Sequence, residues 1–400
     1  MVQTLSNVFI VSTVRTPIGK YGRSLRNFSA VELGSIVIKE VIKRAGLEPQ
    51  DIEFYIMGQV IQAGCGQNPA RLAAIRAGIS PKIGGFTVNQ VCASGLVAVI
   101  LGAELIKSGK YDIVIAGGME SMSRAPFLIS ADARWGLRFV PKALGGYTLI
   151  DSMTCDGLWD HIYDKVMGCL AEETAKKYGI TRQDADYFAY HSHMRAAKAT
   201  RNEEFKKEII PIRTSPNSML DYDEGIRPDT SLEKLGKLRP VFAENGIITA
   251  GNASQLSDGA AALILASEKA VKEHDLKPLA KIVDWELYFN DPKDFLEAPV
   301  HSIKRLLERN HLEINDIDYY EVNEAFAITN ALVTKLLKVP HEKLNIRGGA
   351  VALGHPIGCS GARILVTLIN ILHDYDGKRG VASICHGGGG AASLIIETIK

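Results

Sequence analysis

Apolar residues recur along the chain in spacings that predict alternating helices and strands. Ala30 to Ala45 and Val300 to Asn310 have the pattern of helices with one buried face. Short apolar runs bounded by polar residues or glycine, such as Val8 to Val11 and Gly380 to Ile384, predict strands. Helices that alternate with short strands indicate an α/β fold, in which we expect mostly parallel sheets.

This pattern occurs twice in the chain. Leu47 to Val60 reads LEPQDIEFYIMGQV and Leu312 to Ala325 reads LEINDIDYYEVNEA, with Leu, Glu, Asp, Ile and Tyr in register. Each segment follows one of the two helix patterns. Further along, an apolar helix pattern (Ala93 to Lys107, Ala362 to His373) leads to a strand and then to glycines in both copies. Two copies predict two sheets packed together.

The last strand of each copy reveals a long insertion in the first. Asp258 to Ile264 (DGAAALI) resembles Gly389 to Ile395 (GGAASLI), and the second of these follows the glycines at once. In the first copy most of the stretch 120–250 intervenes, and it is polar and weakly periodic, as expected of a flap over a site. We therefore predict an N-terminal half, 1–276, that contains the insertion, and a C-terminal half, 277–400.

Composition narrows the class of protein. The chain has 400 residues, of which 46% are hydrophobic, and a net charge of +1, so a nucleic acid is not an expected partner. The sequence contains neither an apolar run of membrane-spanning length nor a signal peptide. The six cysteines form no C-x-x-C pair, so we expect no metal site and interpret them as free thiols in the cytoplasm.

Cys92 is the first candidate for chemistry. It lies in Asn89 to Leu96 (NQVCASGL), where an apolar helix pattern begins. Unpaired N–H groups at a helix N-terminus lower the pKa of a thiol, so the position suits a reactive cysteine. A cysteine that serves only as a small buried hydrophobic residue is an equally open interpretation.

His355 lies on a turn, between a glycine and a proline in the segment 348–358 (GGAVALGHPIG). Its counterpart in the first copy falls within a few positions of Cys92, so the repeat predicts that the two turns are neighbours. A histidine there could act as a base on the thiol. The alternative is a loop histidine held by hydrogen bonds.

Cys385 ends a predicted strand and opens a glycine run, in the segment 383–390 (SICHGGGG). Consecutive glycine N–H groups can point into a site and stabilise an oxyanion. A glycine-rich turn with an unrelated thiol is the alternative. Alternation along the strand sends His386 to the opposite face, so we assign it no role. Asn323 stands where the matching strand ends, and its amide could hold a water or a carbonyl oxygen.

Other motifs carry less weight. His191 and His193 have the spacing of a zinc pair, but no third ligand lies nearby, and we expect them on a solvated helix face. The chain has no Walker phosphate loop, no G-x-G-x-x-G and no G-x-S-x-G.

Six ordered segments together resemble the thiolase family along essentially the whole chain. They are Arg15 to Gly19, Asn89 to Leu96, Gly251 to Ser254, Asn323 to Phe326, Gly348 to Arg363, and Cys385 with its glycines. The resemblance implies a five-layer αβαβα fold, built from two repeated halves with an inserted loop domain. This architecture agrees with the internal repeat.

The resemblance also implies a reaction, that of an acetyl-CoA C-acetyltransferase, which reversibly joins two acetyl-CoA into acetoacetyl-CoA and CoA. Cys92 is implied to carry the acyl group, His355 to activate it, and Cys385 to move a proton at the α-carbon. Asn323, with His355 and a water, is implied to form one oxyanion hole. The N–H groups of Cys92 and Gly387 are implied to form the other.

Coenzyme A is implied to bind largely through the insertion, as substrate and product, with no further cofactor. Arg227 is implied to contact its nucleotide end, with a solvated surface charge as the alternative. The other implied contacts, mostly near the pantetheine, are Leu158, Met167, Ser254, Ala325 and Phe326. A homo-oligomer (dimer or tetramer) and association with a downstream CoA enzyme are further implications.

The chain departs from the family at two positions. Val166-Met167-Gly168 stands where many short-chain thiolases have His-Met-Gly, and Arg347 stands where Asn or His is more familiar. Both departures bear on the acyl group that is accepted. The alternatives are a longer-chain 3-ketoacyl-CoA thiolase and a non-catalytic acyl-CoA-binding subunit of a larger complex.

Overall fold

The computed structural model describes residues 7–131, 133–136 and 148–399; the other residues of the predicted halves lie outside this description. In the described chain, ten strands form one sheet, in the order β14-β15-β16-β13-β1-β12-β5-β3-β4, with β2 paired to β12. These strands are β1 (Val8–Arg15), β2 (Gly19–Lys20), β3 (Phe54–Gly58), β4 (Gly84–Val88), β5 (Ile113–Ser121), β12 (Ser257–Ser267), β13 (Ala280–Phe289), β14 (Tyr319–Val322), β15 (Arg379–His386) and β16 (Gly390–Thr398).

The sheet repeats the same pairing in each half. β3 runs parallel to β5 as β14 does to β15, and then β12 and β16 follow antiparallel, next to β1 and β13. The expectation of mostly parallel sheets is wrong, since only the β3–β4, β3–β5 and β14–β15 pairings of the described sheet are parallel. The cause is the closing strand: β16 returns from β15 through a short glycine turn, which forces the antiparallel direction.

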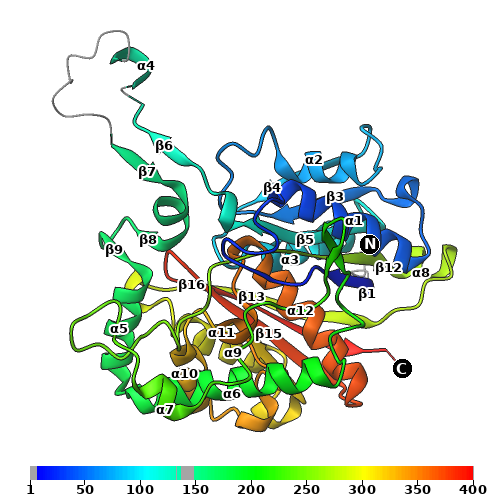
Figure 1. The fold of residues 1–400 in the computed structure, drawn as a ribbon. Coiled ribbons are helices and arrows are strands. Elements are labelled where there is room, and N and C mark those ends of the chain that lie inside the picture. Colours follow the sequence, from blue (N-terminus) through cyan, green and yellow to red (C-terminus); the bar gives the residue numbers. More distant parts are fainter. Residues whose placement is uncertain (1–6, 132, 137–147, 400) are drawn as a thin grey trace.

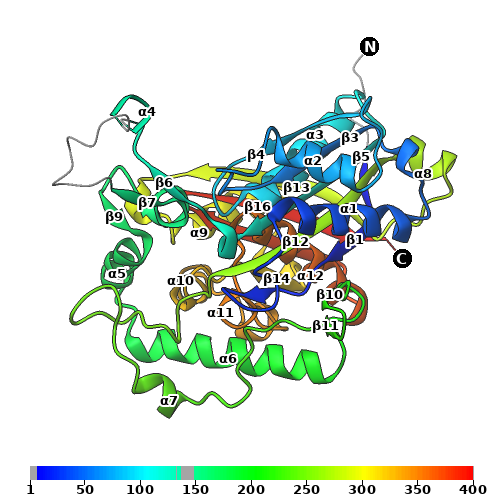
Figure 2. The same cartoon turned by 45° about the horizontal axis from the view of Figure 1, so that its top comes forward.

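Helices form three layers around the two halves of the sheet (Figures 1 and 2). One core lies between the first half and α1 and α2, and a second core lies between the other half and α9 and α10. The third core holds α3 and α12 between the halves, which meet at one edge where β1 pairs with β13. The helices are α1 (Ala30–Ala45), α2 (Pro69–Arg76), α3 (Ser94–Lys107), α8 (Glu268–Glu273), α9 (Ala298–Arg309), α10 (Ala327–Leu337), α11 (Ala350–Leu353) and α12 (Ile357–Asp374).

Glycines let the two central helices touch through their backbones. A methyl group at Gly95 of α3 would lie 2.7 Å from the Ala362 nitrogen, and one at Gly361 of α12 would lie 2.4 Å from the Leu96 nitrogen. Only glycine fits such an approach. The N-terminal ends of α3 and α12 therefore lie side by side, and so do the turns that precede them.

The segment between β5 and β12 is held to the sheet by a buried arginine. Arg15 Nε donates to Glu208 (2.7 Å), and its two terminal nitrogens donate to the carboxylate of Asp223 (2.7 and 2.9 Å). A planar guanidinium suits this two-sided pairing. The first family-like segment, Arg15 to Gly19, thus fastens the insertion.

The insertion has its own short elements. Its β6–β7 hairpin extends away from the rest of the molecule (Figure 1), whereas α6 packs on α10 and α11. The elements are β6 (Phe127–Ile129), α4 (Ala133–Gly136), β7 (Leu149–Asp151), β8 (Trp159–Asp160), β9 (Lys165–Val166), α5 (Met167–Tyr178), α6 (Arg182–Arg201), β10 (Ile212–Ser215), β11 (Ser218–Leu220) and α7 (Leu232–Gly236). Among the described residues, no helix is both long and apolar enough to cross a membrane.

Candidate active site

The turn before α3 is strained and firmly held. Val91, a β-branched residue, has a φ of +47°, a backbone conformation that such side chains rarely adopt. Asn89 Oδ1 accepts the Val91 N–H (2.9 Å), while the Ser94 hydroxyl accepts the Gln90 N–H and donates to the Val91 carbonyl. Strain that is fixed in this way is typical of functional turns. Here it sets the position of Cys92.

The partly buried position of Cys92 reverses the expected direction of its pKa. Burial raises the pKa to about 12, although the N–H groups of Gly387 and of Cys92 itself both point at the sulfur and oppose the rise. The expectation that the helix N-terminus lowers this pKa is wrong, because burial destabilises the thiolate by more than the two N–H groups stabilise it. The resting group is a neutral thiol, and it needs a base.

His355 has the form of such a base. Its Nδ1 lies 2.6 Å from Ser360 Oγ, which donates its own hydrogen to the Pro356 carbonyl (3.0 Å) and must therefore accept from the ring. The opposite nitrogen, Nε2, lies 3.4 Å from the Asn323 amide nitrogen, which can only donate. Both contacts fix the tautomer with the proton on Nδ1 and a lone pair on Nε2. Burial lowers the pKa of His355 to about 3, so the ring is neutral.

Asn323 and Cys385 complete the group of buried polar residues that the sequence singled out. Asn323 follows β14 directly, and its second amide hydrogen remains available beside His355 Nε2. Cys385 lies at the end of β15, where burial raises the pKa of its thiol and the neighbouring Cys92 raises it further. The structure thus brings Cys92, Cys385 and Gly387 together at one place.

Glu120 belongs to this group of residues, but the sequence did not single it out. This fully buried carboxylate accepts the N–H groups of Val60 (3.0 Å), Ile61 (3.3 Å) and Gly358 (2.9 Å). Burial raises its pKa to about 7. Glu120 therefore ties the start of α12, and with it the His355 turn, to the first half. The sequence marks Glu120 only as a charged residue within an apolar strand.

The implied CoA contacts divide into two groups, of which the first lies close to Cys92. A methyl group at Gly387 would lie 3.8 Å from the Met167 sulfur and 3.5 Å from Val91. Leu158 packs in the same apolar cluster as Val91 and Cys92. These contacts place Met167 beside Gly387, and Leu158 in the apolar cluster that the strained turn also joins.

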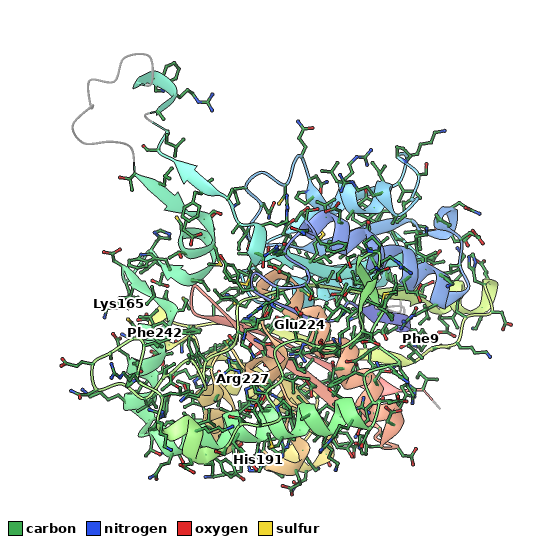
Figure 3. The ribbon with its side chains drawn as sticks, viewed as in Figure 1. Phe9, Lys165, His191, Glu224, Arg227 and Phe242 are labelled. Carbon is green, nitrogen blue, oxygen red and sulfur yellow. The ribbon has the colours of Figure 1, made fainter. Side chains whose placement is uncertain are left out.

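The second group joins the insertion to the end of β14. The Ser254 N–H donates to the Ala325 carbonyl (3.0 Å), and the Phe326 ring packs edge-on against Phe242 at 6.1 Å. Phe242 and Arg227 both come from the inserted segment (Figure 3), and the Arg227 backbone N–H donates to His193 Nδ1 (3.1 Å).

His193 is therefore not on a solvated helix face, as expected from the sequence. Its side chain is buried, and burial lowers its pKa to about 4, so the ring accepts the Arg227 N–H in its neutral form. Within the described part of the chain, no group of three or more His, Cys, Asp or Glu side chains could hold a metal ion.

Arg347 does not belong to this site. Its buried guanidinium pairs with Glu204 (2.8 Å) and with Asp374 (2.5 Å), the last residue of α12, and packs over the Tyr375 ring. His355 precedes the other end of the same helix. The expected bearing of Arg347 on the acyl group is therefore wrong. Its function is to join the end of α12 to Glu204 of the insertion.

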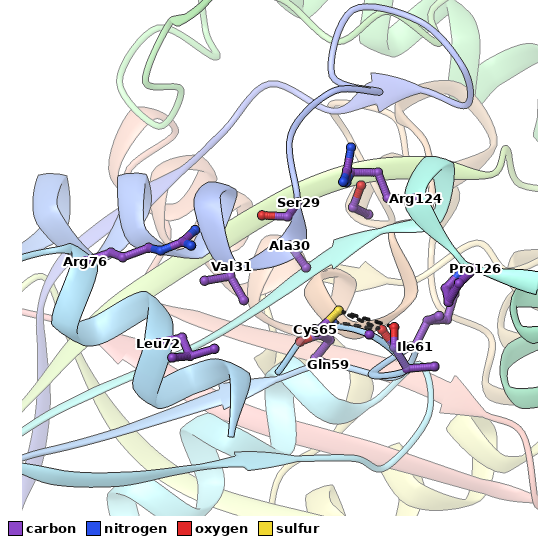
Figure 4. Close-up of a pocket in the computed structure, with 13 residues that line it drawn as sticks. Ser29, Ala30, Val31, Gln59, Ile61, Cys65, Leu72, Arg76, Arg124 and Pro126 are labelled. Atoms are coloured by element: carbon purple, nitrogen blue, oxygen red, sulfur yellow. Dashed lines mark hydrogen bonds between the residues drawn. The ribbon is translucent and has the colours of Figure 1, made fainter. Parts of the chain in front are cut away.

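A separate cavity lies beside α1 and has a different lining (Figure 4). It has a volume of about 390 Å³ and contains Cys65, whose sulfur accepts from the Gln59 amide (3.2 Å). Arg76, Arg124 and Ser29 are among its other lining residues, whereas Cys92, His355 and Cys385 are not. Cys65 is therefore a thiol outside the candidate active site.

The protonation state of Cys92 can be measured through thiolate absorbance at 240 nm. With a pKa of about 12, the thiolate fraction at pH 9 is about one in a thousand, and it is smaller at lower pH. The spectrum of the protein minus that of the Cys92→Ser variant should therefore show no thiolate between pH 5 and pH 9. A thiolate signal at pH 7 would instead indicate a thiolate–imidazolium pair.

Comparisons with known proteins identify the family of the chain. The family model described as the thiolase N-terminal domain matches residues 8–269, and that of the thiolase C-terminal domain matches residues 276–398. A Staphylococcus aureus protein named probable acetyl-CoA acyltransferase is 42% identical over 99% of this chain and 100% of its own length. A Synechocystis acetyl-CoA acetyltransferase is 44% identical, with the same coverage.

Solved structures give the same result. A thiolase from Ascaris suum in complex with coenzyme A superposes with a TM-score of 0.91 at 41% identity, covering 98% of this chain and 100% of that one. The human mitochondrial 3-ketoacyl-CoA thiolase in complex with CoA gives 0.94 at 37% identity, covering 99% of each chain. With both halves matched at these identities, the chain belongs to the thiolase family and is an acyltransferase.

Proposed function

We propose that the protein is an acetyl-CoA C-acetyltransferase, which interconverts two acetyl-CoA with acetoacetyl-CoA and CoA through an acyl group on Cys92. The observation that favours a short acyl group is the place of Met167. Its thioether would lie 3.8 Å from a methyl group at Gly387, the residue whose N–H points at the Cys92 sulfur. A side chain there occupies the space that a longer acyl chain would need.

The first half-reaction transfers the acyl group. His355 Nε2 takes the proton of the Cys92 thiol, and the sulfur attacks the thioester carbonyl of acetyl-CoA. The new S–C bond forms as the bond to the CoA sulfur breaks, and the leaving thiolate takes its proton from Cys385, which is left as a thiolate while His355 keeps the proton of Cys92. The N–H groups of Cys92 and Gly387, which point at the sulfur, are the donors for the oxyanion of this step.

The second half-reaction makes the carbon–carbon bond. Cys385, as thiolate, removes a proton from the α-carbon of a second acetyl-CoA. The resulting enolate oxygen is stabilised by the free amide hydrogen of Asn323, by the His355 side chain and by a water. The enolate carbon attacks the acyl-cysteine, the S–C bond to Cys92 breaks, and the Cys92 sulfur regains its proton from His355, while Cys385 keeps the α-proton. Thiolysis is the same sequence in reverse.

Relatives support both this proposal and one alternative. Bacterial relatives are named for acetyl-CoA acyltransferase or acetyltransferase activity, whereas the human structure is a 3-ketoacyl-CoA thiolase. The two similar structures are complexes with CoA, which supports CoA as the ligand of this chain. Its proposed contacts are Arg227, Ser254, Leu158, Met167, Ala325 and Phe326. A homo-oligomer in the cytoplasm, with a predicted boundary between halves at residues 276/277, completes the proposal.

The test is thiolysis of 3-ketoacyl-CoA substrates of increasing length. We expect acetoacetyl-CoA to have the highest kcat/KM, with a fall of at least about 100-fold on adding two methylenes, since each methylene in a closed pocket is worth roughly ten- to 200-fold. Met167→Ala should narrow this difference. Met219→Ala, at an exposed methionine, is the control and should leave the preference unchanged.

Two results would contradict the proposal in different ways. A preference of the unaltered protein for chains of eight or more carbons would identify a longer-chain 3-ketoacyl-CoA thiolase. Activity that appears only after a partner protein is added would support the acyl-CoA-binding subunit.

A further inference from the structure

The last hydrogen-bond donor of the candidate active site stands at the start of a glycine turn. Gly387 is followed by Gly388 and Gly389, with φ values of +84° and +85°, before β16 begins. Glycine backbones have the widest freedom of rotation, so such a turn does not hold an N–H group in place by itself. The Gly387 N–H nevertheless points at the Cys92 sulfur.

The side chain that holds this turn is His386. Its Nδ1 lies 2.6 Å from the Gly387 carbonyl oxygen, and its Nε2 lies 3.3 Å from the side-chain amide nitrogen of Gln90. A carbonyl can only accept and an amide nitrogen can only donate. The ring is therefore neutral, with its proton on Nδ1 and a lone pair on Nε2. Burial lowers the pKa of His386, which favours the neutral ring.

The ring itself has little freedom to move. His386 is 2% exposed, and the Phe289 ring packs edge-on against it at 5.8 Å. On another side lies Gly390, its partner across the β15–β16 pairing, where a methyl group would come within 2.2 Å of Nε2. The imidazole thus occupies space that only a glycine at position 390 leaves open.

We infer that His386 is a positioning residue, which joins the Cys92 turn to the Gly387 turn and aims the Gly387 N–H at the reacting sulfur. The two contacts of the ring belong to turns from the two halves of the chain. Gln90 stands two residues before Cys92, and the Gly387 carbonyl belongs to the residue whose N–H faces that thiol. Fixing both turns through one rigid ring prepares the donor before substrate binds. This inference rests on the function proposed above.

Two substitutions separate the roles of the ring nitrogens. His386→Asn keeps an amide where Nδ1 stands, so it can still donate to the Gly387 carbonyl. His386→Gln carries the same amide to the place of Nε2, where it can reach only Gln90. The loss of one aimed oxyanion donor costs about 10²- to 10³-fold, and a loosened one costs less. We expect kcat for thiolysis to fall about ten- to 100-fold in His386→Gln and about threefold at most in His386→Asn, with KM nearly constant.

Amide exchange provides a second readout that needs no activity. Deuterium uptake by the peptide that contains residues 385–390 should rise in His386→Gln and stay near that of the unaltered protein in His386→Asn. His373→Asn is the matched control. Its ring also contacts a backbone carbonyl, that of Leu279 (2.8 Å). His373 lies near the C-terminal end of α12, whereas the candidate site lies at the N-terminal end of that helix. This substitution should change neither kcat nor exchange at residues 385–390.

Failure of this inference and failure of the proposed function are distinguishable. Equal kcat and equal exchange in the Asn and Gln variants would overturn the positioning role while leaving Cys92 chemistry intact. Absence of thiolysis in the unaltered protein would overturn the proposed function, and the exchange experiment would still decide whether His386 holds the turn.

Discussion

Replacing Cys92 with serine should lower kcat for acetoacetyl-CoA thiolysis by at least about 10⁴-fold, the order of loss that follows removal of an activated nucleophile. Serine keeps the size of the side chain and its contacts with the Gly387 N–H. It does not keep the acidity or the nucleophilicity of sulfur, because a neutral His355 ring can deprotonate a thiol far more easily than an alcohol. A loss of this size with unchanged thermal unfolding would assign covalent chemistry to this position.

The control for this substitution is another half-buried thiol outside the site. Cys65→Ser keeps an acceptor for the Gln59 amide and lies in the cavity beside α1. It should retain activity within about twofold. Mass spectrometry after incubation with acetyl-CoA provides a second check, because one acetyl group should appear on the unaltered protein and none on Cys92→Ser. Substantial activity in Cys92→Ser would exclude the acyl-cysteine.

The repeat could be predicted from sequence because its signal is local. The two copies of Leu-Glu-x-x-Asp-Ile form the same short 3₁₀ turn, and in both the acidic residue at its end (Asp51, Asp316) accepts the N–H of the preceding glutamate. Short-range hydrogen bonds of this kind are encoded within a few residues. The direction of the closing strands depends on partners far along the chain, and there the expectation of parallel pairing failed.

The candidate site also has some features that the sequence predicts and others that only the fold shows. Cys92, His355 and Cys385 stand in turns that glycine and proline mark in the sequence, so their positions at element ends were predictable. The pKa of Cys92 was not, since a helix start is visible in the sequence and the packing of other elements around the thiol is not. Glu120 accepts backbone N–H groups from distant residues, and His386 contacts the side chain of Gln90 in the other half of the chain; the sequence shows neither contact. Arg347 departs from the family pattern, and only the fold shows that its side chain lies away from the candidate active site.

Replacing His355 with alanine should lower kcat by about 10³- to 10⁴-fold, since a neutral thiol with a pKa of about 12 requires a base to become a nucleophile. Acylation by acetyl-CoA alone, followed by mass spectrometry, should slow to a similar extent, because the proton transfer precedes the first bond. His373→Ala, a histidine at the other end of α12, is the control and should acylate at the normal rate.

Ser360→Ala should give a smaller effect through the same histidine. Ser360 Oγ accepts the Nδ1 proton of His355, and without it the ring loses the contact that keeps the lone pair on Nε2. The loss of one such hydrogen bond is worth about tenfold in kcat. An unchanged acylation rate in His355→Ala would exclude this ring as the base. A loss in His355→Ala without any loss in Ser360→Ala would show that Asn323 alone maintains the tautomer.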